Sequence, residues 1–466
     1  MKLNELTICE MLKDLEAGKF TVVELAEDII NQIKKMDKLG ALIEFNEDAL
    51  RSQAKMSDTR RHDNKAGKLE GIPLVLKDNI DTKDMATTGG TGALAGKIPS
   101  NDAPAVATLR EEGAIISAKA VLHELAFGIT CNNSITGPVH NPYDPSLIPG
   151  GSSGGTASAI SSRQFPGGLG TDTGGSVRIP SALCGLFGFR PSVGRYSGKG
   201  VIPISSTRDT IGPIARCIED ILLLDSIMAV ETVLDIEPAE PKTIKIGMPK
   251  TRLWEDLEPG VQELSQNFMN ELKANGIEII EKDFPDIWEL NDNTGFPVAL
   301  YEVMRDLPAY LRNAGYGISL EEMIKGIGSP DVLGIISSQT GEEAMPESAY
   351  KAAIELHRPK MQEIYASYFR DNGIDGIIFP TTPLTARPIG QDETVELNGN
   401  QQPTFQTFIR NTDLGSNLGA PGISLPIGLS KGLPVGIEFD GLPGCDERLL
   451  SIALGVNKLL PSTPAP

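Results

Sequence analysis

Two glycine-rich segments place serines where a nucleophile and an oxyanion site could form. The second of them, Gly170-Thr-Asp-Thr-Gly-Gly-Ser-Val-Arg-Ile-Pro180, has two glycines directly before Ser176. Glycines let successive backbone N–H groups turn inward, which provides the donors that a tetrahedral oxyanion needs. A tight turn in which Ser176 caps the following helix would give the same pattern. The segment is therefore a candidate catalytic site with a structural alternative.

The first segment, Gly150-Gly-Ser-Ser-Gly-Gly-Thr156, has two further interpretations. A flexible linker has this composition. The segment also matches G-x-S-x-G at Ser152 and at Ser153, the pattern of the nucleophile elbow in α/β-hydrolases. An elbow enzyme needs a histidine after the serine, and only His357 follows, in a polar helical stretch, which argues against an elbow. No Gly-Lys-Ser/Thr closes the run, so a phosphate-binding loop is excluded as well.

A lysine is the best candidate for the general base, because the sequence has only four histidines. Burial penalises an ammonium ion and lowers its pKa toward neutrality, so a desolvated lysine can accept a proton. Lys77 ends the apolar run Gly-Ile-Pro-Leu-Val-Leu, and a strand that enters the core would deliver its side chain to a buried site. The alternative is that Lys77 begins an exposed turn, as most lysines do.

The segments around these motifs show the alternation that is typical of an α/β protein. Ile72–Leu76 and Ala114–Ala118 are predicted as strands, and Val106–Glu112 and Ile218–Met228 as helices. Glycine is dense between residues 150 and 200, where we expect loops and short helices in tight contact. Further strands are predicted at Ile244–Met248, Ile277–Ile280, Ile377–Phe379 and Val435–Phe439, and a further helix around Val261–Ala274.

The predicted organisation is one large domain with additions. Residues 1–60 are expected to be N-terminal helices packed on the core, because Thr7–Glu10 and Thr21–Glu24 both have capping-box spacing. Residues 61–466 are expected to form a single domain with a mainly helical excursion at about 300–370. The glycine-rich centre shows no obvious linker on either side, which favours one domain over several.

The acidic balance excludes several classes of partner. The 466 residues include 42 lysines and arginines against 62 acids, for a formal charge of −20. Nucleic acid and anionic membrane surfaces need clustered positive charge, so neither is expected as a partner. The start of the chain carries acidic residues where a signal peptide needs an apolar stretch, and no apolar run is long enough to span a membrane.

Cysteine usage and ligand spacing bear on the compartment and on cofactors. A disulfide framework or structural zinc site is not expected, because the cysteines are scattered and form no C-x-x-C pair; a reducing cytoplasm fits best. No His, Asp and Glu cluster has metal-ligand spacing, so neither a metal nor another cofactor is expected. The five cysteines are Cys9, Cys131, Cys184, Cys217 and Cys445.

Together these segments resemble the amidase signature family over most of the chain. The three motifs are GIPLVLKDNI around Lys77, NPYDPSLIPGGSSGGTAS around Ser152 and GLGTDTGGSVRIPSALCG around Ser176. The separation of the two serines is the one that the family uses. Flanking pieces also agree, namely Gly188-Phe-Arg-Pro191, Asp209-Thr-Ile-Gly-Pro213 and Leu433-Pro-Val-Gly-Ile437. The resemblance implies an α/β fold with a mixed β-sheet of about eleven strands covered by helices on both faces.

The resemblance also implies a Ser–Ser–Lys triad. Ser176 would attack the amide and form an acyl-enzyme, while Ser152, held after a cis peptide bond, would relay the proton between Ser176 and neutral Lys77. The relay would also protonate the leaving nitrogen, because an amide anion is a very poor leaving group. The implied supporting groups are the backbone N–H donors of Thr173, Gly174, Gly175 and Ser176, the side chains of Ser153, Asp172 and Arg178, and a substrate wall at Ala126, Phe127 and Gly128.

The expected reaction is hydrolysis of a small aryl or arylalkyl amide to an acid plus ammonia or an amine. The sequences of residues 123–129 and 206–213 most resemble those of bacterial hydrolases of indoleacetamide and mandelamide. Three alternatives stay open: an amidase-like glutaminase subunit of a tRNA-dependent amidotransferase, a non-catalytic scaffold, and a purely structural role of Phe127 in the core. The expected partner is a small-molecule amide. The sequence does not fix the oligomeric state, for which a homodimer is one option.

Overall fold

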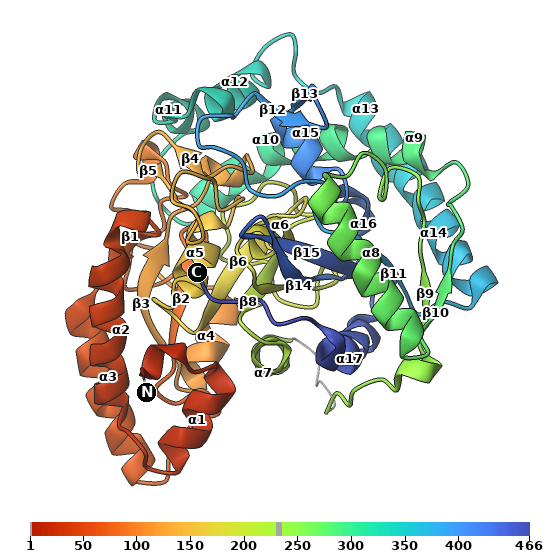
Figure 1. Ribbon diagram of the computed structural model, residues 1–466. Helices are drawn as coiled ribbons and strands as arrows, with labels where there is room; N and C mark the ends of the chain where they lie inside the picture. The colour runs from red at the N-terminus through yellow and green to blue at the C-terminus, as the bar shows by residue number, and fades with distance from the viewer. Residues whose placement is uncertain (1, 230–234) are drawn as a thin grey trace.

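The protein is described here by a computed structural model that covers residues 2–229 and 235–466. One mixed sheet of eleven strands runs through the molecule (Figure 1), which confirms the expected α/β fold class. In spatial order its strands are β1 (Leu42–Phe45), β3 (Ile115–Ala120), β2 (Pro73–Lys77), β6 (Gly167–Asp172), β8 (Thr210–Ala215), β7 (Phe187–Arg190), β14 (Gly422–Ser430), β15 (Leu433–Asp440), β11 (Gly376–Pro380), β9 (Lys245–Gly247) and β10 (Glu278–Ile280).

The direction of the strands changes along the sheet. β3, β2 and β6 are parallel neighbours, whereas every pair from β6 to β11 is antiparallel and β11, β9 and β10 are parallel again. Two small hairpins lie outside the sheet, β4–β5 and β12–β13. Their strands are Asn132–Asn133, Gly137–Pro138, Thr394–Leu397 and Asn400–Pro403.

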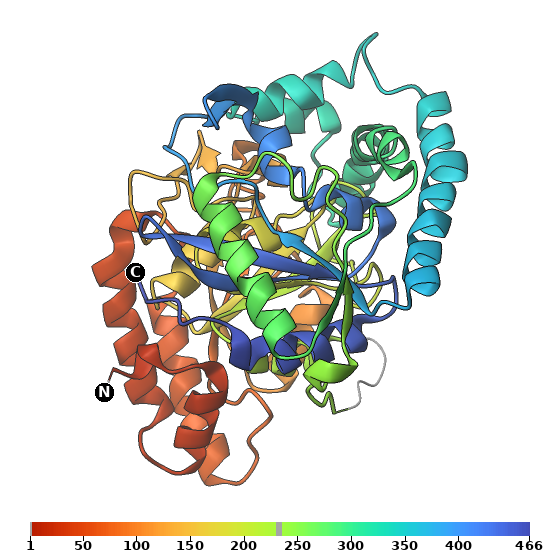
Figure 2. The same cartoon turned by 45° about the vertical axis from the view of Figure 1, so that its right-hand side comes forward.

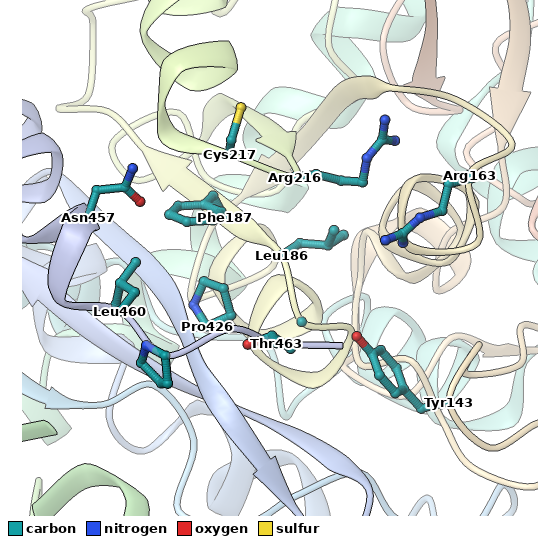
Figure 3. A pocket seen from close by; sticks show the side chains of 12 residues that line it. Tyr143, Arg163, Leu186, Phe187, Arg216, Cys217, Pro426, Asn457, Leu460 and Thr463 are labelled. Carbon is teal, nitrogen blue, oxygen red and sulfur yellow. The ribbon is translucent and has the colours of Figure 1, made fainter. Parts of the chain in front are cut away.

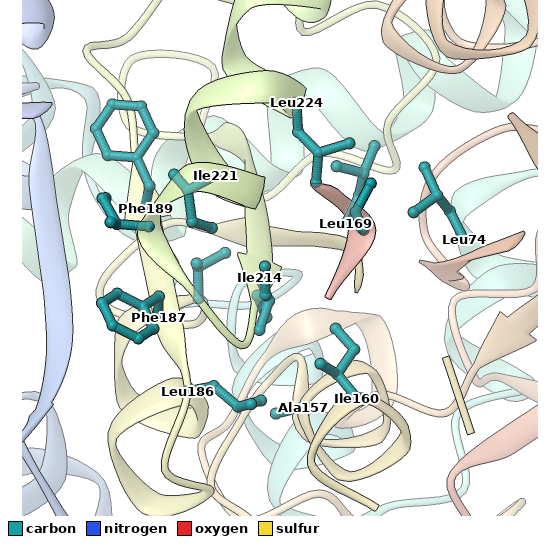
Figure 4. Packing of buried hydrophobic residues seen from close by; sticks show 14 of the residues in the cluster. Leu74, Ala157, Ile160, Leu169, Leu186, Phe187, Phe189, Ile214, Ile221 and Leu224 are labelled. Carbon is teal, nitrogen blue, oxygen red and sulfur yellow. The ribbon is translucent and has the colours of Figure 1, made fainter. Parts of the chain in front are cut away.

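Helices cover both faces of the sheet (Figures 1 and 2). The core between them is apolar: Figure 4 shows Ala157 and Ile160 on one side of the strands and Ile221 and Leu224 on the other. The helices are α1 (Ile8–Glu16), α2 (Val22–Met36), α3 (Glu47–His62), α4 (Pro104–Glu111), α5 (Gly154–Ser161), α6 (Arg178–Leu183), α7 (Ile218–Met228), α8 (Pro259–Ala274), α9 (Ile287–Asp292), α10 (Gly295–Asn313), α11 (Leu320–Lys325), α12 (Pro330–Ser338), α13 (Glu347–Ala352), α14 (Arg358–Asn372), α15 (Thr404–Ile409), α16 (Asp413–Leu418) and α17 (Asp446–Val456).

The predicted capping boxes are present at the start of α1 and α2. Thr7 and Thr21 each accept a hydrogen bond from the backbone N–H three residues later, and the carboxylates of Glu10 and Glu24 accept one from the backbone N–H of the capping threonine. Residues 42–45 are an exception to the predicted run of N-terminal helices. They form the edge strand β1, which pairs antiparallel with β3.

The glycine-rich centre contains two central strands where only loops and short helices were predicted. β6 and β7 both lie inside the sheet, and glycine obscures their apolar pattern. The glycines are needed for close approach, because a Cβ on Gly168 would lie 2.2 Å from the carbonyl oxygen of Val75 on β2. A Cβ on Gly170 would lie 2.6 Å from Oγ of Ser153. The sheet and the serine loop therefore pack more tightly than any larger residue would allow.

The helices α10 to α14 wrap around one end of the molecule, at the top and right of Figures 1 and 2. They occupy the stretch that the sequence predicts to be mainly helical. Three of these helices have their own apolar cluster, centred on Leu307, Leu311, Met323 and Ile336. None of the helices in the described part of the chain is both long and apolar enough to cross a membrane.

Candidate active site

The site forms at the carboxyl ends of β2 and β6. These strands are parallel neighbours, so their last residues lie at the same edge of the sheet, where α/β proteins usually bind ligands. Lys77 is the last residue of β2, and Thr171 and Asp172 end β6. The apolar residues of β2 therefore carry the Lys77 side chain into the core rather than into an exposed turn.

Lys77 is fully buried and hydrogen-bonded to two hydroxyl groups. Its Nζ lies 2.7 Å from Oγ of Ser152 and 2.7 Å from Oγ1 of Thr171. Burial lowers the pKa of Lys77 to about 7, even though the nearby acidic groups Asp172 and Asp209 favour the charged form. A substantial fraction of this lysine is therefore neutral at neutral pH.

Ser152 lies in the loop before α5, directly after a cis peptide bond between Gly151 and Ser152. Its carbonyl oxygen accepts hydrogen bonds from the backbone N–H of His123 at 3.1 Å and from the thiol of Cys131 at 3.2 Å. The same sulfur accepts from the backbone N–H of Gly154, also at 3.2 Å. The Cys131 thiol thus holds both ends of the serine turn, a role that its isolated position in the sequence does not reveal.

Ser153 joins the two serine segments. Its Oγ donates to the carbonyl oxygen of Thr171 at 3.2 Å, and its backbone N–H donates to the carbonyl oxygen of Ser176 at 3.3 Å. These bonds link the start of α5 to both ends of the loop that follows β6. The structure therefore brings Lys77, Ser152, Ser153 and Ser176 into one site.

Ser176 lies between β6 and α6 and lines a cavity. It is 8% exposed, and within the described part of the chain its hydroxyl has no hydrogen-bond partner, so Oγ can face the cavity. The backbone N–H groups of Thr173, Gly174 and Ser176 donate to none of the described residues. The N–H of Gly175 differs, because it donates to a carboxylate oxygen of Asp172 at 2.9 Å.

Gly175 has a backbone conformation that side chains rarely adopt. Its φ is +138°, and a Cβ at this position would lie 2.3 Å from Oγ1 of Thr412. That hydroxyl donates to the carbonyl oxygen of Gly174 at 2.5 Å. Two contacts therefore fix the glycine turn: Asp172 holds the N–H of Gly175, and Thr412, which precedes α16, holds the carbonyl oxygen of Gly174.

A buried charge cluster supports this turn. The Asp172 carboxylate accepts bonds from Nε and Nη2 of Arg178 at 3.0 Å each, from Nη1 of Arg190 at 2.8 Å and from the N–H of Val177 at 3.1 Å. Burial alone would raise the pKa of Asp172, but the two guanidinium groups outweigh burial and hold it well below its usual range. Asp172 thus joins the guanidinium of Arg178 to the backbone of the glycine turn.

The cluster extends into the C-terminal strands, which sequence reasoning did not include. Nη1 of Arg178 donates to Glu438 at 2.5 Å and lies 4.0 Å from Asp440, both on β15. Burial raises the pKa of Glu438, and it raises that of Asp440 to about 6. The two arginines thus face three acids, Asp172, Glu438 and Asp440. Arg190 lies in the flanking motif Gly188–Pro191. Its contact with Asp172 becomes visible only from the sheet order, in which β8 alone separates β7 from β6.

The cavity in front of Ser176 has a volume of about 340 Å³ and mainly apolar walls. Ala126, Phe127 and Gly128, the residues predicted to form a substrate wall, all line it. Its charged groups are Arg208 and Asp413, which pair with each other at 2.7 Å. Further apolar lining residues are Ile204, Phe296, Ile335, Phe405 and Ile409.

A second cavity, of about 260 Å³, lies away from the predicted site residues (Figure 3). It contains one phenol, Tyr143, and one thiol, Cys217. Burial raises the pKa of Tyr143 to about 12 and raises that of the Cys217 thiol as well, so both stay protonated at neutral pH. This cavity therefore lacks an activated nucleophile. Among residues 2–229 and 235–466, no group of three His, Cys, Asp or Glu side chains is placed to hold a metal ion.

The eleven-stranded mixed sheet is shared with a solved amidase structure, and comparisons with known proteins identify the chain as a hydrolase that acts on C–N amide bonds. The chain belongs to the Amidase family, whose model matches residues 24–450. It is 43% identical to an indoleacetamide hydrolase of Rhizobium radiobacter over 96% of this chain and 95% of that protein. It is 39% identical to a mandelamide hydrolase of Pseudomonas putida, over 99% and 93%. A crystal structure of an amidase superposes with a TM-score of 0.88 at 33% identity, covering 98% of this chain and all of the other.

Proposed function

We propose that this amidase hydrolyses a small aryl or arylalkyl amide through an acyl-enzyme, with Ser176 as nucleophile, Ser152 as proton relay and Lys77 as base. The observation that carries the proposal is the 2.7 Å hydrogen bond between Ser152 and a fully buried Lys77. A buried lysine with a pKa of about 7 can accept a proton at neutral pH, which an exposed lysine cannot do.

The proposed reaction moves one proton from Ser176 through Ser152 to Lys77 and then back. Oγ of Ser176 attacks the amide carbon, its proton passes to Oγ of Ser152, and the Ser152 proton passes to Nζ of Lys77. When the C–N bond breaks, Lys77 returns the proton through Ser152 to the leaving nitrogen, so that ammonia or an amine departs. Water then repeats the same steps on the acyl-enzyme and releases the acid.

The oxyanion would be held by the backbone N–H groups of Thr173, Gly174 and Ser176. The resemblance also includes Gly175, but its N–H already donates to Asp172. We therefore assign Gly175 the role of shaping the turn, with Asp172 and Arg178 fixing its orientation. Preorganised donors of this kind usually supply a large share of amide hydrolysis, because they meet the charge that develops in the transition state.

The cavity favours an aromatic acyl group over glutamine. Arg208 donates to Asp413 at 2.7 Å, to the carbonyl oxygen of Gly295 at 2.9 Å and to that of Thr173 at 3.2 Å, so the pair is satisfied within the protein. The ammonium and carboxylate of glutamine would meet apolar walls and this closed pair. The substrates named for the two relatives, indoleacetamide and mandelamide, are small aryl-containing amides that suit such a cavity.

A panel of substrates tests the proposal. We expect kcat/KM to be highest for primary arylalkyl amides such as phenylacetamide, lower for acetamide, and lowest for glutamine. Anilides and esters of phenylacetic acid would report whether the leaving group is selected as well. Preferred hydrolysis of glutamine, or co-purification with a partner subunit needed for activity, would contradict the proposal and favour the amidotransferase alternative.

A further inference from the structure

His123 lies at a junction between the serine loop, the cavity wall and the helical excursion. It is 2% exposed, and its backbone N–H donates to the carbonyl oxygen of Ser152 at 3.1 Å. Its Nε2 lies 2.9 Å from Oδ2 of Asp331, on α12. One residue therefore contacts the catalytic loop through its backbone and a distant helix through its ring.

The ring of His123 supports the cavity wall from behind. A Cβ at Gly128 would lie between 2.2 and 2.5 Å from three atoms of the imidazole, so the ring fills the space that a side chain would need. Gly128 itself lines the cavity in front of Ser176. The position of the ring thus sets how far this part of the wall extends into the cavity.

The partner of the ring lies on a helix that contributes another part of the cavity wall. Asp331 is in the first turn of α12, and Ile335, one helical turn later, lines the cavity. Residues four apart lie on the same face of a helix, so a contact at Asp331 fixes the placement of Ile335. The buried carboxylate of Glu124 accepts from the N–H groups of Gly328 at 3.0 Å and Ser329 at 2.7 Å, just before this helix.

We propose that the His123–Asp331 pair is a specificity-determining device that sets the width of the substrate cavity for a ring-bearing acyl group. The pair acts through Gly128 and Ile335, so its members are positioning residues that do not touch the reacting atoms. This inference rests on the proposed function of the cavity. The link from His123 to Ser152 runs through the backbone, which a change at Asp331 leaves in place.

The test removes the partly exposed member of the pair. In Asp331→Ala we expect KM for phenylacetamide to rise about tenfold, while kcat changes less than about twofold. A rise of this size is typical when an apolar pocket fits its substrate less well. Glu321→Ala is the matched control, because Glu321 also lies in the first turn of an excursion helix, α11, and pairs with Lys325 at 2.7 Å away from the cavity. The control should keep the wild-type KM, and circular dichroism should show both variants folded.

A double-mutant cycle distinguishes the pair from a general effect on the helix. If Asp331 acts through His123, then His123→Gln combined with Asp331→Ala should raise KM no further than the larger single effect. Additive effects in the double variant, an unchanged KM in Asp331→Ala, or a fall in kcat at constant KM would each overturn the inference. The proposed function itself is tested on a different variant: if Ser176→Ala still hydrolyses the amide, the proposed function is wrong, whatever the result for Asp331.

Discussion

The Oγ1 of Thr171 lies as close to Nζ of Lys77 as the Oγ of Ser152 does, at 2.7 Å, and the Thr171 carbonyl oxygen lies 3.4 Å from the same nitrogen. A neutral lysine has two N–H groups and one lone pair. When Thr171 accepts both N–H groups, the lone pair is left for the Ser152 hydroxyl. Thr171, at the end of the neighbouring parallel strand, therefore orients the proposed base.

Replacing Thr171 by valine tests this orientation. Thr171→Val keeps the shape of the side chain but removes the acceptor, so the Lys77 lone pair is no longer directed at Ser152. We expect kcat for phenylacetamide to fall about 100-fold, the usual consequence of a small misalignment of a catalytic group. Thr171→Ser restores the hydroxyl and should recover most of the rate. Wild-type kcat in Thr171→Val would show that Lys77 is oriented by other contacts.

Replacing Ser176 by alanine tests the proposed nucleophile. We expect kcat to fall about 10⁴-fold or more, because the acyl-enzyme can no longer form, while the far-ultraviolet circular dichroism stays that of the folded protein. Mass spectrometry of the wild-type enzyme with a slowly hydrolysed ester should show the acyl group on the peptide that contains Ser176. Label on any other peptide would refute the assignment.

The pH dependence of kcat/KM should follow Lys77. Below its pKa this lysine carries the proton and cannot accept one from Ser152, so the rate should fall as the pH decreases through about 7. The expected slope is about tenfold per pH unit on this acid limb. Lys77→Ala should abolish amide hydrolysis and, with it, the limb.

A histidine control is needed, because an unperturbed histidine titrates near ~6.5 and would place a limb in the same range. His357→Ala should leave the limb unchanged, since His357 lies on the helical excursion and outside the cavity lining. Esters need less assistance for their leaving group, so Lys77→Ala should impair ester hydrolysis less than amide hydrolysis. A limb that survives in Lys77→Ala and disappears in a histidine variant would exclude lysine as the base.

Metal removal should not affect the reaction, since the proposed steps use only side chains and water. We expect dialysis against a strong chelator to leave kcat and KM for phenylacetamide unchanged. Added zinc, magnesium or manganese should give no increase over the dialysed enzyme. Activity that is lost on dialysis and restored by one of these ions would require a metal-dependent mechanism instead.

The sequence predicts the three residues of the proposed triad better than the residues that hold them in place. Lys77, Ser152 and Ser176 each lie in a local pattern, an apolar run or a glycine–serine turn, that is visible without knowing the fold. Thr171 lies inside the quoted segment Gly170–Pro180 but has no role in that pattern, and Cys131 lies in no such pattern. Their roles arise because β2 and β6 are adjacent and because the chain before β4 passes under the serine loop.

The same distinction applies to the fold. The starts of the two helices with capping boxes, and the bounds of strands with apolar runs such as β2, are predicted close to those observed, because their signals are local. The strands β1, β6, β7, β8 and β14 are missed: β6 is rich in glycine for close packing, and β1 is a short edge strand with half-buried residues. The cavity walls on α10, α12 and α15 are also hidden in the sequence, since they meet only through tertiary packing.

The ion pair between Arg178 and Glu438 has a consequence for the order in which the enzyme becomes active. All three residues of the proposed triad precede residue 180, but the carboxyl group that Arg178 contacts on β15 follows 260 residues later. A ribosome adds roughly 5–20 residues per second, so a nascent chain carries its complete triad for between roughly ten seconds and one minute before β15 emerges. During that interval Arg178 lacks its partner on β15 and β14 has not yet joined the sheet. Completion of the site therefore waits for β15, and it ties amide hydrolysis to a chain that has been synthesised through Asp440.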